Sequence, residues 1–280
     1  MKKYGEIYFL GKCNCKCFYC IGNEISESDD EEATKQMHPW ELRNFDRFLK
    51  LLHENSYDTV YLSSVKTEPL LYRHIDEMID ILIEQGFKVG IRTNGYLYNM
   101  YRESFYKMEE EISFSVQGMT SSVNHAICGV YTMPDWEFIF QDLREHHKKC
   151  RVTMVINQQN KEEFFDLLDL CAKYNDVVTY VQGRRMYRED GKVPLYEEVA
   201  FKVVKKQLTK KSKYLIPSFG GSFGYNWFSD KTLRKIDVYL WEKPFEKTTI
   251  SPINYFVNGQ ITTACHIVLG KEKHHEEIAM

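Results

Sequence analysis

Four cysteines lie close together near the start of the chain, and their spacing is the strongest chemical signal in the sequence. The segment GKCNCKCFYCIGN places Cys13, Cys17 and Cys20 in a three-then-two spacing. Thiolates are the usual ligands of iron–sulfur clusters. Three thiolates on one loop leave one iron of a cubane open for a cofactor or substrate. The spacing therefore predicts a four-iron, four-sulfur cluster on these three residues.

A single zinc ion is the alternative, because Cys15 offers a fourth thiolate in the same loop. Zinc sites usually place their ligands in two separated pairs that tie distant segments together. No second pair appears in this sequence. The histidines, among them His38 and His53, show no metal-ligand spacing.

The bulk composition describes a globular chain. It has 280 residues, of which 43% are hydrophobic and 28% are charged, and a formal net charge of −3. This balance gives no positive field to attract nucleic acid. No apolar run approaches the roughly 18 residues of a membrane-spanning helix, and the first residues lack a cleavage site for a signal peptide. We expect a cytoplasmic protein with no membrane partner. A reducing cytosol disfavours disulfides, so the clustered cysteines indicate a metal site.

Short strand-like segments alternate with helical periodicity through the first two thirds of the chain. Each strand candidate is rich in β-branched or aromatic residues and ends at a polar residue or glycine; the candidates are residues 6–11, 59–64, 88–94, 111–117, 151–157 and 177–183. Apolar residues at three- and four-residue steps predict helices near residues 42–52, 75–83 and 164–171. The alternation predicts an α/β fold with a parallel sheet, either open and doubly wound or a partial barrel. In both, chemistry takes place at the carboxyl ends of the strands.

The pattern changes after residue 183, and we assign residues 184–280 to a small C-terminal α+β cap. Helices are predicted over Leu195–Leu208 and Lys231–Glu242. Residues 253–265 are predicted to form a hairpin, because Asn258-Gly259 favours a type I′ turn.

The cysteine motif directly after the first strand resembles the radical S-adenosylmethionine (SAM) superfamily, and Tyr19 before the last cysteine is also typical there. The resemblance covers roughly residues 6–183. It implies a partial (β/α)6 TIM-like barrel over residues 1–183, with one [4Fe-4S] cluster and SAM as cofactors. It also implies reductive cleavage of SAM to a 5′-deoxyadenosyl radical that takes a hydrogen atom from the substrate.

Further landmarks of the family follow in order at the ends of the predicted strands. Lys66-Thr67-Glu68-Pro69 stands where the family has Gly-Gly-Glu-Pro, so the glycines are missing. The resemblance implies that Glu68 accepts a hydrogen bond from the methionyl amino group. Thr93-Asn94-Gly95 matches the family's Thr-Asn-Gly.

Three later strand ends complete the set of implied cofactor contacts. Ser115 would lie near the ribose or carboxylate of SAM, with Gln117 at the family's aspartate position. Asn157 ends the fifth strand, and backbone groups near Val181 in the sixth would meet adenine.

Two cysteines outside the cluster motif are candidate hydrogen-atom donors in the chemistry. Cys128 is expected in the loop after the fourth strand, and Cys265 follows the C-terminal hairpin. Each is alternatively a small buried hydrophobic residue, because cysteine is among the most buried residue types. Cys150 and Cys171 are expected at helix positions, in packing roles.

The resemblance leaves the substrate open. A peptide or small metabolite is the leading expectation, and a nucleoside or nucleotide-type metabolite is the alternative within the same chemistry. Outside enzymes, the alternative is a zinc-binding interaction module. The C-terminal hairpin also resembles a degenerate SPASM or twitch subdomain, for which we expect no auxiliary cluster. A flavodoxin- or ferredoxin-type protein is the expected reductant, and we expect no leader-peptide-binding domain before the first strand.

Overall fold

The computed structural model describes residues 3–24, 32–187, 193–212, 215–217, 222–242 and 253–263. These residues form an α/β fold built on one open sheet of eleven strands, in the order β11-β10-β1-β2-β3-β4-β5-β6-β9-β8-β7. Neighbouring strands from β1 to β6 are parallel. The predicted α/β class and partial TIM-like barrel are confirmed.

All six predicted strands are present within a few residues of their expected bounds. They are β1 (Gly5–Phe9), β2 (Thr59–Ser64), β3 (Lys88–Thr93), β4 (Ile112–Ser115), β5 (Cys150–Ile156) and β6 (Val178–Arg185). Short strands rich in valine, isoleucine and aromatic residues suit a pleated sheet that is buried on both faces.

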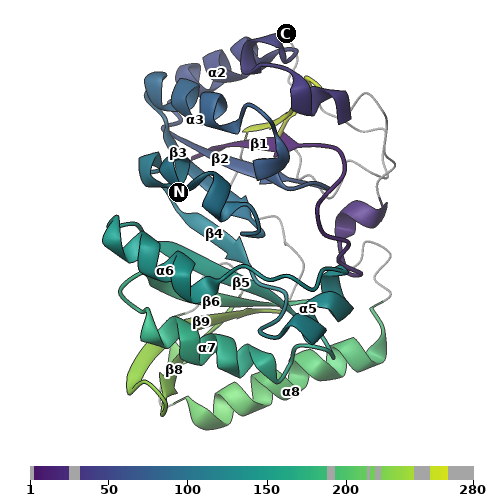
Figure 1. Ribbon diagram of the computed structural model, residues 1–280, viewed down its shortest axis with the longest axis vertical. Helices are drawn as coiled ribbons and strands as arrows, with labels where there is room; N and C mark the ends of the chain where they lie inside the picture. The colour runs from purple at the N-terminus through teal and green to yellow at the C-terminus, as the bar shows by residue number, and fades with distance from the viewer. Residues whose placement is uncertain are drawn as a thin grey trace.

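Helices follow these strands and cover one face of the sheet (Figure 1). They are α2 (Phe45–Glu54), α3 (Ile75–Glu84), α4 (Arg102–Lys107), α5 (Ser121–Cys128), α6 (Trp136–Glu145) and α7 (Glu163–Lys173). Short 3-10 turns precede three of these helices: η1 (Ile21–Glu24), η2 (Thr34–Gln36) and η3 (Pro39–Glu41) lie before α2, η4 (Pro69–Leu71) before α3, and η5 (Tyr98–Met100) before α4. Gly86 follows α3 with φ of +83°, a left-handed conformation that glycine adopts without steric cost. Among the described residues, no helix has both the length and the apolar character that a membrane crossing requires.

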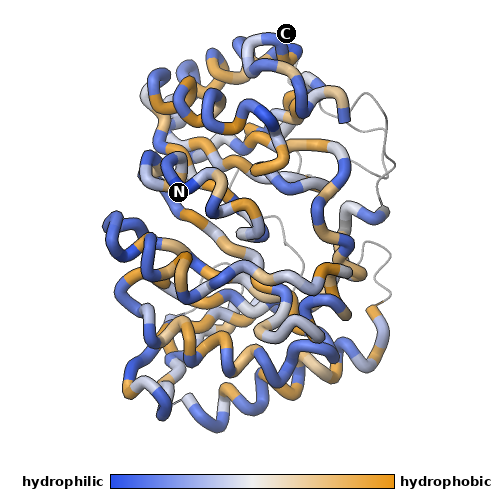
Figure 2. Tube along the Cα trace, in the orientation of Figure 1, coloured by the Kyte–Doolittle hydropathy of each residue, from blue (hydrophilic) through white to orange (hydrophobic). Residues whose placement is uncertain are grey.

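The two faces of the sheet differ in chemistry because successive side chains point to opposite sides of a strand. A side chain at Gly5 would meet Leu52 and Phe48 of α2, so this position faces the helices. The neighbouring Glu6 belongs to the other face, where it pairs with Arg92. Figure 2 shows hydrophobic residues concentrated along the strands and alternating with hydrophilic residues along the helices. The helix side is therefore the apolar core, and the opposite face carries polar groups.

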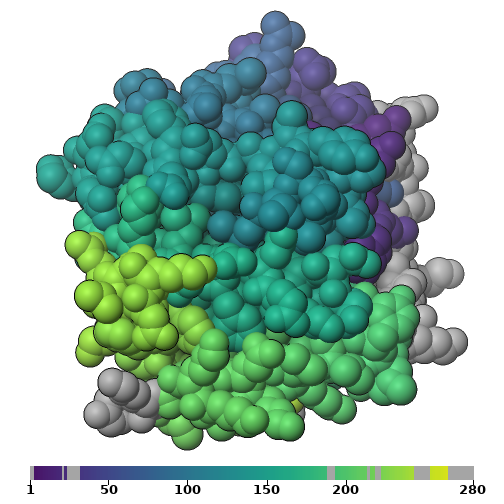
Figure 3. All heavy atoms as spheres, turned by 60° about the horizontal axis from the view of Figure 1, so that its bottom comes forward, coloured from purple at the N-terminus to yellow at the C-terminus, as the bar shows by residue number. Residues whose placement is uncertain are grey.

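The C-terminal region extends the same sheet at both edges. β9 (Arg234–Trp241) pairs with β6 in parallel, and β8 (Phe223–Ser229) and the short β7 (Leu215–Ile216) continue from it antiparallel. The helix predicted over Leu195–Leu208 is confirmed as α8 (Leu195–Lys211). In Figure 3, α8 and the β8–β9 hairpin lie on the same face of the molecule, below the helices of the barrel. The boundary between residues 183 and 184 stays a prediction.

The helix predicted over Lys231–Glu242 is wrong, because most of this segment is β9. Ile236, Val238 and Leu240 are buried while the residues between them are partly exposed. This two-residue alternation is the signature of a strand, and it outweighs the weak helical periodicity of the segment.

The predicted C-terminal hairpin is present, although its turn differs from the expectation. β10 (Ile253–Phe256) pairs with β1 in parallel and with β11 (Ile261–Thr262) antiparallel. A type I′ turn requires positive φ at both central residues. Only Gly259 shows it, with φ of +96°, and Asn258 does not. The loop is also longer than two residues, so the type I′ assignment is wrong.

Candidate functional site

The cysteine-rich segment that follows β1 lies at the carboxyl ends of the strands, beside α5 (Figure 1). Backbone hydrogen bonds tie it to α5: the Lys16 amide donates to the Cys128 carbonyl at 2.8 Å, and the Phe18 amide donates to the Ile127 carbonyl at 3.1 Å. We call residues 11–20 the cysteine loop. The loop has no regular secondary structure of its own, and these hydrogen bonds to α5 hold it in place.

A second anchor holds the base of the cysteine loop. The Lys12 carbonyl accepts hydrogen bonds from Lys35 Nζ at 2.6 Å and from Thr67 Oγ1 at 2.7 Å. Lys35 is 5% exposed, so its ammonium group is held inside the protein by this contact and by Glu32. Sequence reasoning missed Lys35, because an isolated lysine usually lies on a solvated surface.

The four thiols of the cysteine loop fall into two environments. Cys13, Cys17 and Cys20 are half-buried, whereas Cys15 is buried. All four are free, and the Cys15 amide donates to Cys13 Sγ at 3.4 Å. The three predicted ligands are thus the three that keep access to space beside the loop.

Hydrogen bonding prepares one of these thiols for deprotonation. The Cys15 thiol and the backbone amides of Cys15 and Asn14 donate toward Cys13 and lower the pKa of its thiol to about 7. Burial raises the pKa of Cys20. Metal ligation needs thiolates and releases their protons. Cys13 is therefore the thiol best prepared to ligate.

The cysteine loop holds no compact thiol site for a single zinc ion. A tetrahedral zinc site with bonds of about 2.3 Å needs sulfurs about 3.8 Å apart. Among the described residues, no three cysteine thiols lie within 4.8 Å of one another. Half-buried cysteine thiols on one anchored loop are the donor type that an iron–sulfur cubane uses.

Glu68, Thr93 and Asn94 form one buried network at the ends of β2 and β3. One carboxylate oxygen of Glu68 accepts from Thr93 Oγ1 at 2.5 Å and from the Leu70 amide at 3.4 Å. The other accepts from the Asn94 amide at 2.8 Å. Burial raises the pKa of Glu68 to about 8, against the lowering effect of these hydrogen bonds. The structure thus brings Glu68 together with Thr93 and Asn94, which sequence analysis placed on a different segment.

Asn94 connects this network to the cysteine loop. Its side-chain amide donates to Asn14 Oδ1 at 2.8 Å and lies 3.7 Å from Cys15 Sγ and 4.0 Å from Cys13 Sγ. Glu68 and Asn94 therefore support the loop whatever else they contact.

Tyr19 links the other end of the cysteine loop to β4. Its hydroxyl donates to Gln117 Oε1, and Gln117 Nε2 donates to the Ser115 carbonyl at 3.2 Å. Burial raises the pKa of Tyr19 well above its usual range, so the phenol stays a neutral donor. The Gln117 side chain thus connects Tyr19 to Ser115 by two hydrogen bonds.

The structure places Asn157 and Val181 in the interior. Asn157 is fully buried, and its side chain serves the local turn: Nδ2 donates to the Val155 carbonyl at 3.1 Å, and Oδ1 accepts from the Gln159 amide at 2.9 Å. Val181 is fully buried in β6. Their cofactor contacts stay predictions.

Cys128 is the last residue of α5, not part of a loop, and it is fully buried against the cysteine loop. Its thiol donates to the Asn124 carbonyl at 3.1 Å and lies 3.5 Å from the Tyr96 hydroxyl. Cys265 lies outside the described residues. Cys150 begins β5, so the expected helix position is wrong, although it and Cys171 in α7 are both buried.

Charged residues line the face of the sheet opposite the helices, which sequence analysis did not single out. Buried Glu6 of β1 pairs with Arg92 of β3. Arg151 of β5 lies 2.8 Å from Glu111. Burial, with Arg151 and Arg92 nearby, lowers the pKa of Arg184 in β6 to about 9. Charged or polar residues alternate with apolar ones along β1, β3, β5 and β6, and this pattern could have revealed the charged face from the sequence.

The chain was compared with protein-family models, curated protein sequences and solved structures. Residues 7–171 match the family model described as the radical SAM superfamily. No protein among the curated sequences matches the chain.

Solved structures match the fold at low sequence identity. SuiB from Streptococcus suis bound to its precursor peptide SuiA matches with a TM-score of 0.66 and 18% identity, over 99% of this chain and 62% of SuiB. The structure of SuiB bound to S-adenosylmethionine matches with a TM-score of 0.63 and 17% identity, over 98% of this chain and 60% of SuiB. The structure of anSMEcpe with bound S-adenosylmethionine matches with a TM-score of 0.52 and 14% identity, over 75% of this chain and 59% of anSMEcpe. The chain thus spans about 62% of the length of SuiB.

Proposed function

The chain belongs to the radical SAM superfamily, an enzyme family that uses a [4Fe-4S] cluster and SAM, and we propose that its substrate is a peptide. The zinc-binding interaction module is therefore set aside. A cluster held by Cys13, Cys17 and Cys20 would supply the single electron that reductive cleavage of SAM requires.

Cys13, Cys17 and Cys20 are proposed to hold the cluster. Their half-buried positions leave the thiols accessible, whereas Cys15 is buried against Asn94. The loop anchors at Lys12, Lys16 and Phe18 keep the three thiols in place before the cluster binds.

The strand ends beside the loop are proposed to hold SAM. In its ionised form Glu68 has about four acceptor sites, of which donors of this chain use three, so one remains for the methionyl amino group. Thr93, Asn94 and Tyr19 keep Glu68 and the loop in register. Ser115, Asn157 and Val181 complete the proposed cofactor contacts.

The fold likeness to SuiB is the observation that carries the peptide proposal. It extends over 99% of this chain, including the C-terminal region that lies beyond the matched family model. SuiB is described in complex with a precursor peptide. The described strands form an open sheet that ends at β11 and β7.

The charged residues on the face of the sheet opposite the helices also support a peptide substrate. Ion pairs at Glu6–Arg92 and Arg151–Glu111 hold guanidinium groups in fixed positions. Guanidinium donors match the carboxylate and carbonyl oxygens of a peptide. Groups fixed in advance orient a substrate with little further loss of freedom.

Substrate-dependent cleavage of SAM tests the peptide proposal. Reduced, cluster-loaded enzyme is incubated with SAM and either a random peptide library or a mixture of nucleosides, and 5′-deoxyadenosine is quantified. The proposal expects faster formation with peptides and a mass change in the responding peptides. Acceleration by nucleosides with none by peptides would overturn it.

A flavodoxin- or ferredoxin-type protein is proposed to supply the electron. Lys12, Lys16 and Phe18 of the cysteine loop are exposed, and they give a basic, partly apolar contact for an acidic partner. Lys16→Glu is expected to slow reduction by flavodoxin and to leave reduction by dithionite unchanged. Equal slowing with both reductants would contradict a docking role.

A further inference from the structure

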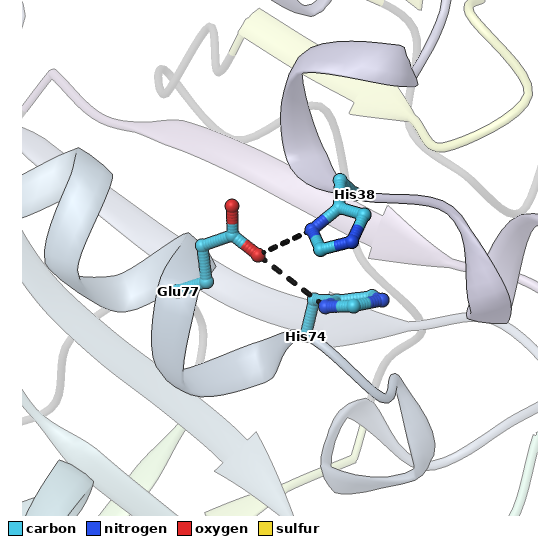
Figure 4. A group of neighbouring side chains, drawn as sticks. All are labelled: His38, His74 and Glu77. Carbon is cyan, nitrogen blue, oxygen red and sulfur yellow. Dashed lines mark hydrogen bonds and ion pairs between the residues drawn. The ribbon is translucent and has the colours of Figure 1, made fainter.

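Two histidines and a glutamate converge outside the cysteine loop, in a group that the proposed function does not use. His38 precedes η3, His74 precedes α3, and Glu77 lies in the first turn of α3. Nδ1 of His38 lies 2.8 Å and Nδ1 of His74 lies 3.3 Å from the same Glu77 carboxylate oxygen (Figure 4). All three donor atoms lie within 4.8 Å of one another. We call these residues the His–Glu group.

The hydrogen bond on the far side of the His74 ring fixes its tautomer. Nε2 of His74 lies 3.2 Å from the Gln36 carbonyl, which only accepts, so Nε2 carries the proton. In the neutral ring Nδ1 then presents a lone pair to the carboxylate oxygen of Glu77. Two lone pairs at 3.3 Å repel each other unless a cation lies between them or the ring is protonated.

The rings of His38 and His74 stack with centroids 3.8 Å apart. Their Nδ1 atoms therefore lie side by side next to the same Glu77 carboxylate oxygen. A metal ion at this point would bind the two ring nitrogens and the carboxylate together.

A histidine whose second nitrogen donates to a backbone carbonyl has the arrangement typical of metal-ligating histidines. Imidazole nitrogen and carboxylate oxygen suit zinc and neighbouring transition metals, whereas calcium and magnesium prefer oxygen alone. Solvent reaches the group, because the side chains of His38 and Glu77 are 55% and 41% exposed. Water can therefore fill the remaining coordination position.

We propose that His38, His74 and Glu77 form a binding site for a divalent transition-metal ion of the zinc class, with water as a further ligand. The site joins residues 34–41 to the start of α3. This segment already contacts the same edge, where the Arg73 amide donates to the Lys35 carbonyl at 3.1 Å and the Tyr72 hydroxyl donates to the Met37 carbonyl at 2.7 Å. A bound ion would clamp the segment that carries Lys35, and through Lys35 the base of the cysteine loop.

Zinc content and zinc X-ray absorption on the cluster-loaded enzyme test the site. The enzyme is exposed to zinc under anaerobic conditions and desalted, and iron and zinc are counted in the same sample. Zinc in the His–Glu group gives nitrogen and oxygen neighbours at about 2.0–2.1 Å, whereas zinc on the cysteine loop gives sulfur at about 2.3 Å. The proposal expects one nitrogen- and oxygen-bound zinc per chain.

Variants distinguish zinc bound at the His–Glu group from zinc bound elsewhere on the protein. His74→Ala and His38→Ala are expected to weaken zinc binding by more than the roughly 10- to 100-fold cost of losing a partner of a metal ligand. Glu77→Gln keeps the shape of the side chain and serves if an alanine variant fails to fold. His53→Ala removes an exposed imidazole of α2 and should keep the zinc. Iron content should be equal in all of them.

Zinc should also raise the unfolding temperature of the wild-type and His53→Ala enzymes but not that of His74→Ala, because a ligand specific for the folded state stabilises it. Sulfur-bound zinc, no zinc in the wild-type enzyme, or full zinc retention in folded His74→Ala would each overturn the proposal.

Discussion

The cysteine loop and the His–Glu group are two donor sets on neighbouring segments, built in opposite ways. The cysteine loop offers half-buried sulfur atoms and is anchored by α5, Lys35, Thr67 and Asn94. The His–Glu group offers nitrogen and oxygen atoms at the starts of η3 and α3, with His38 and Glu77 exposed and His74 only 16% exposed. Soft, enclosed donors suit an iron–sulfur cluster, and borderline donors open to water suit a zinc-class ion. The two proposals therefore assign a different metal to each segment, according to its position and donor type.

Lys35 connects the two regions. It lies three residues before His38, and its ammonium group donates to the cysteine loop at Lys12. Changes in one region can therefore be compared directly with matched changes in the other.

The largest expected effect is the loss of iron. Cys17→Ala should abolish the cluster, because two cysteine ligands do not complete a three-thiolate site. Iron content and thiolate-to-iron absorbance measure the result, and zinc in the His–Glu group should be unchanged. Cys15→Ala is the matched control and should keep its iron. A colourless Cys15→Ala protein beside a brown Cys17→Ala protein would reverse the ligand assignment.

The next largest expected effect is a loss of SAM affinity, which a comparison of two glutamate variants measures. Glu68→Ala should weaken SAM binding by about ten- to a hundredfold, the cost of roughly 1.5–3 kcal/mol for one hydrogen bond to a charged group. Glu77→Ala, on the outer side, should leave SAM affinity unchanged. Equilibrium binding to the cluster-loaded protein measures both. Unchanged affinity in Glu68→Ala would remove it from the cofactor site, and loss of iron as well would make its role structural.

The connection between the two regions should have a moderate effect. Lys35→Met keeps most of the side-chain volume but removes the buried ammonium donor to Lys12. The free energy of unfolding should fall by about 1.5–3 kcal/mol, measured by denaturant on metal-free protein. Lys50→Met is the control, because its side chain is 75% exposed. Equal stability of the two variants would show that Lys35 does not hold the loop.

Cys128 should give the smallest effect. Its buried contact with Asn124 and the cysteine loop indicates packing. Cys128→Ala should lower the free energy of unfolding by about 1–2 kcal/mol and still produce 5′-deoxyadenosine. A variant of normal stability that diverts the product would instead support the hydrogen-donor role.

The sequence predicted the barrel well because its local signals agree with the fold. The strand TVYLSS and the helix at Ile75–Glu84 carry clear periodicities, and both are present. The segment Arg234–Trp241 was missed because its alternation is mixed with charged residues and its partner β6 is distant in sequence.

The site was predictable in its chemistry but not in its connections. Cysteine spacing makes Cys13, Cys17 and Cys20 the predicted ligands, because the motif is local, and their ligation stays a prediction. The links from Glu68 to Asn94 and from Asn94 to Asn14 depend on strands that meet only in three dimensions. His38 and His74 are likewise far apart in the chain, so their convergence on Glu77 appears only in the structure.

Cleavage of SAM tests the central claim most directly. Anaerobically prepared, iron-replete protein is reduced with dithionite and incubated with SAM, and 5′-deoxyadenosine and methionine are measured by mass spectrometry. The account predicts both products in equal amounts from the wild-type enzyme and neither from Cys17→Ala. An iron-replete, reduced wild-type protein that leaves SAM intact, or a Cys17→Ala protein that cleaves it equally well, would contradict the assignment of the cysteine loop.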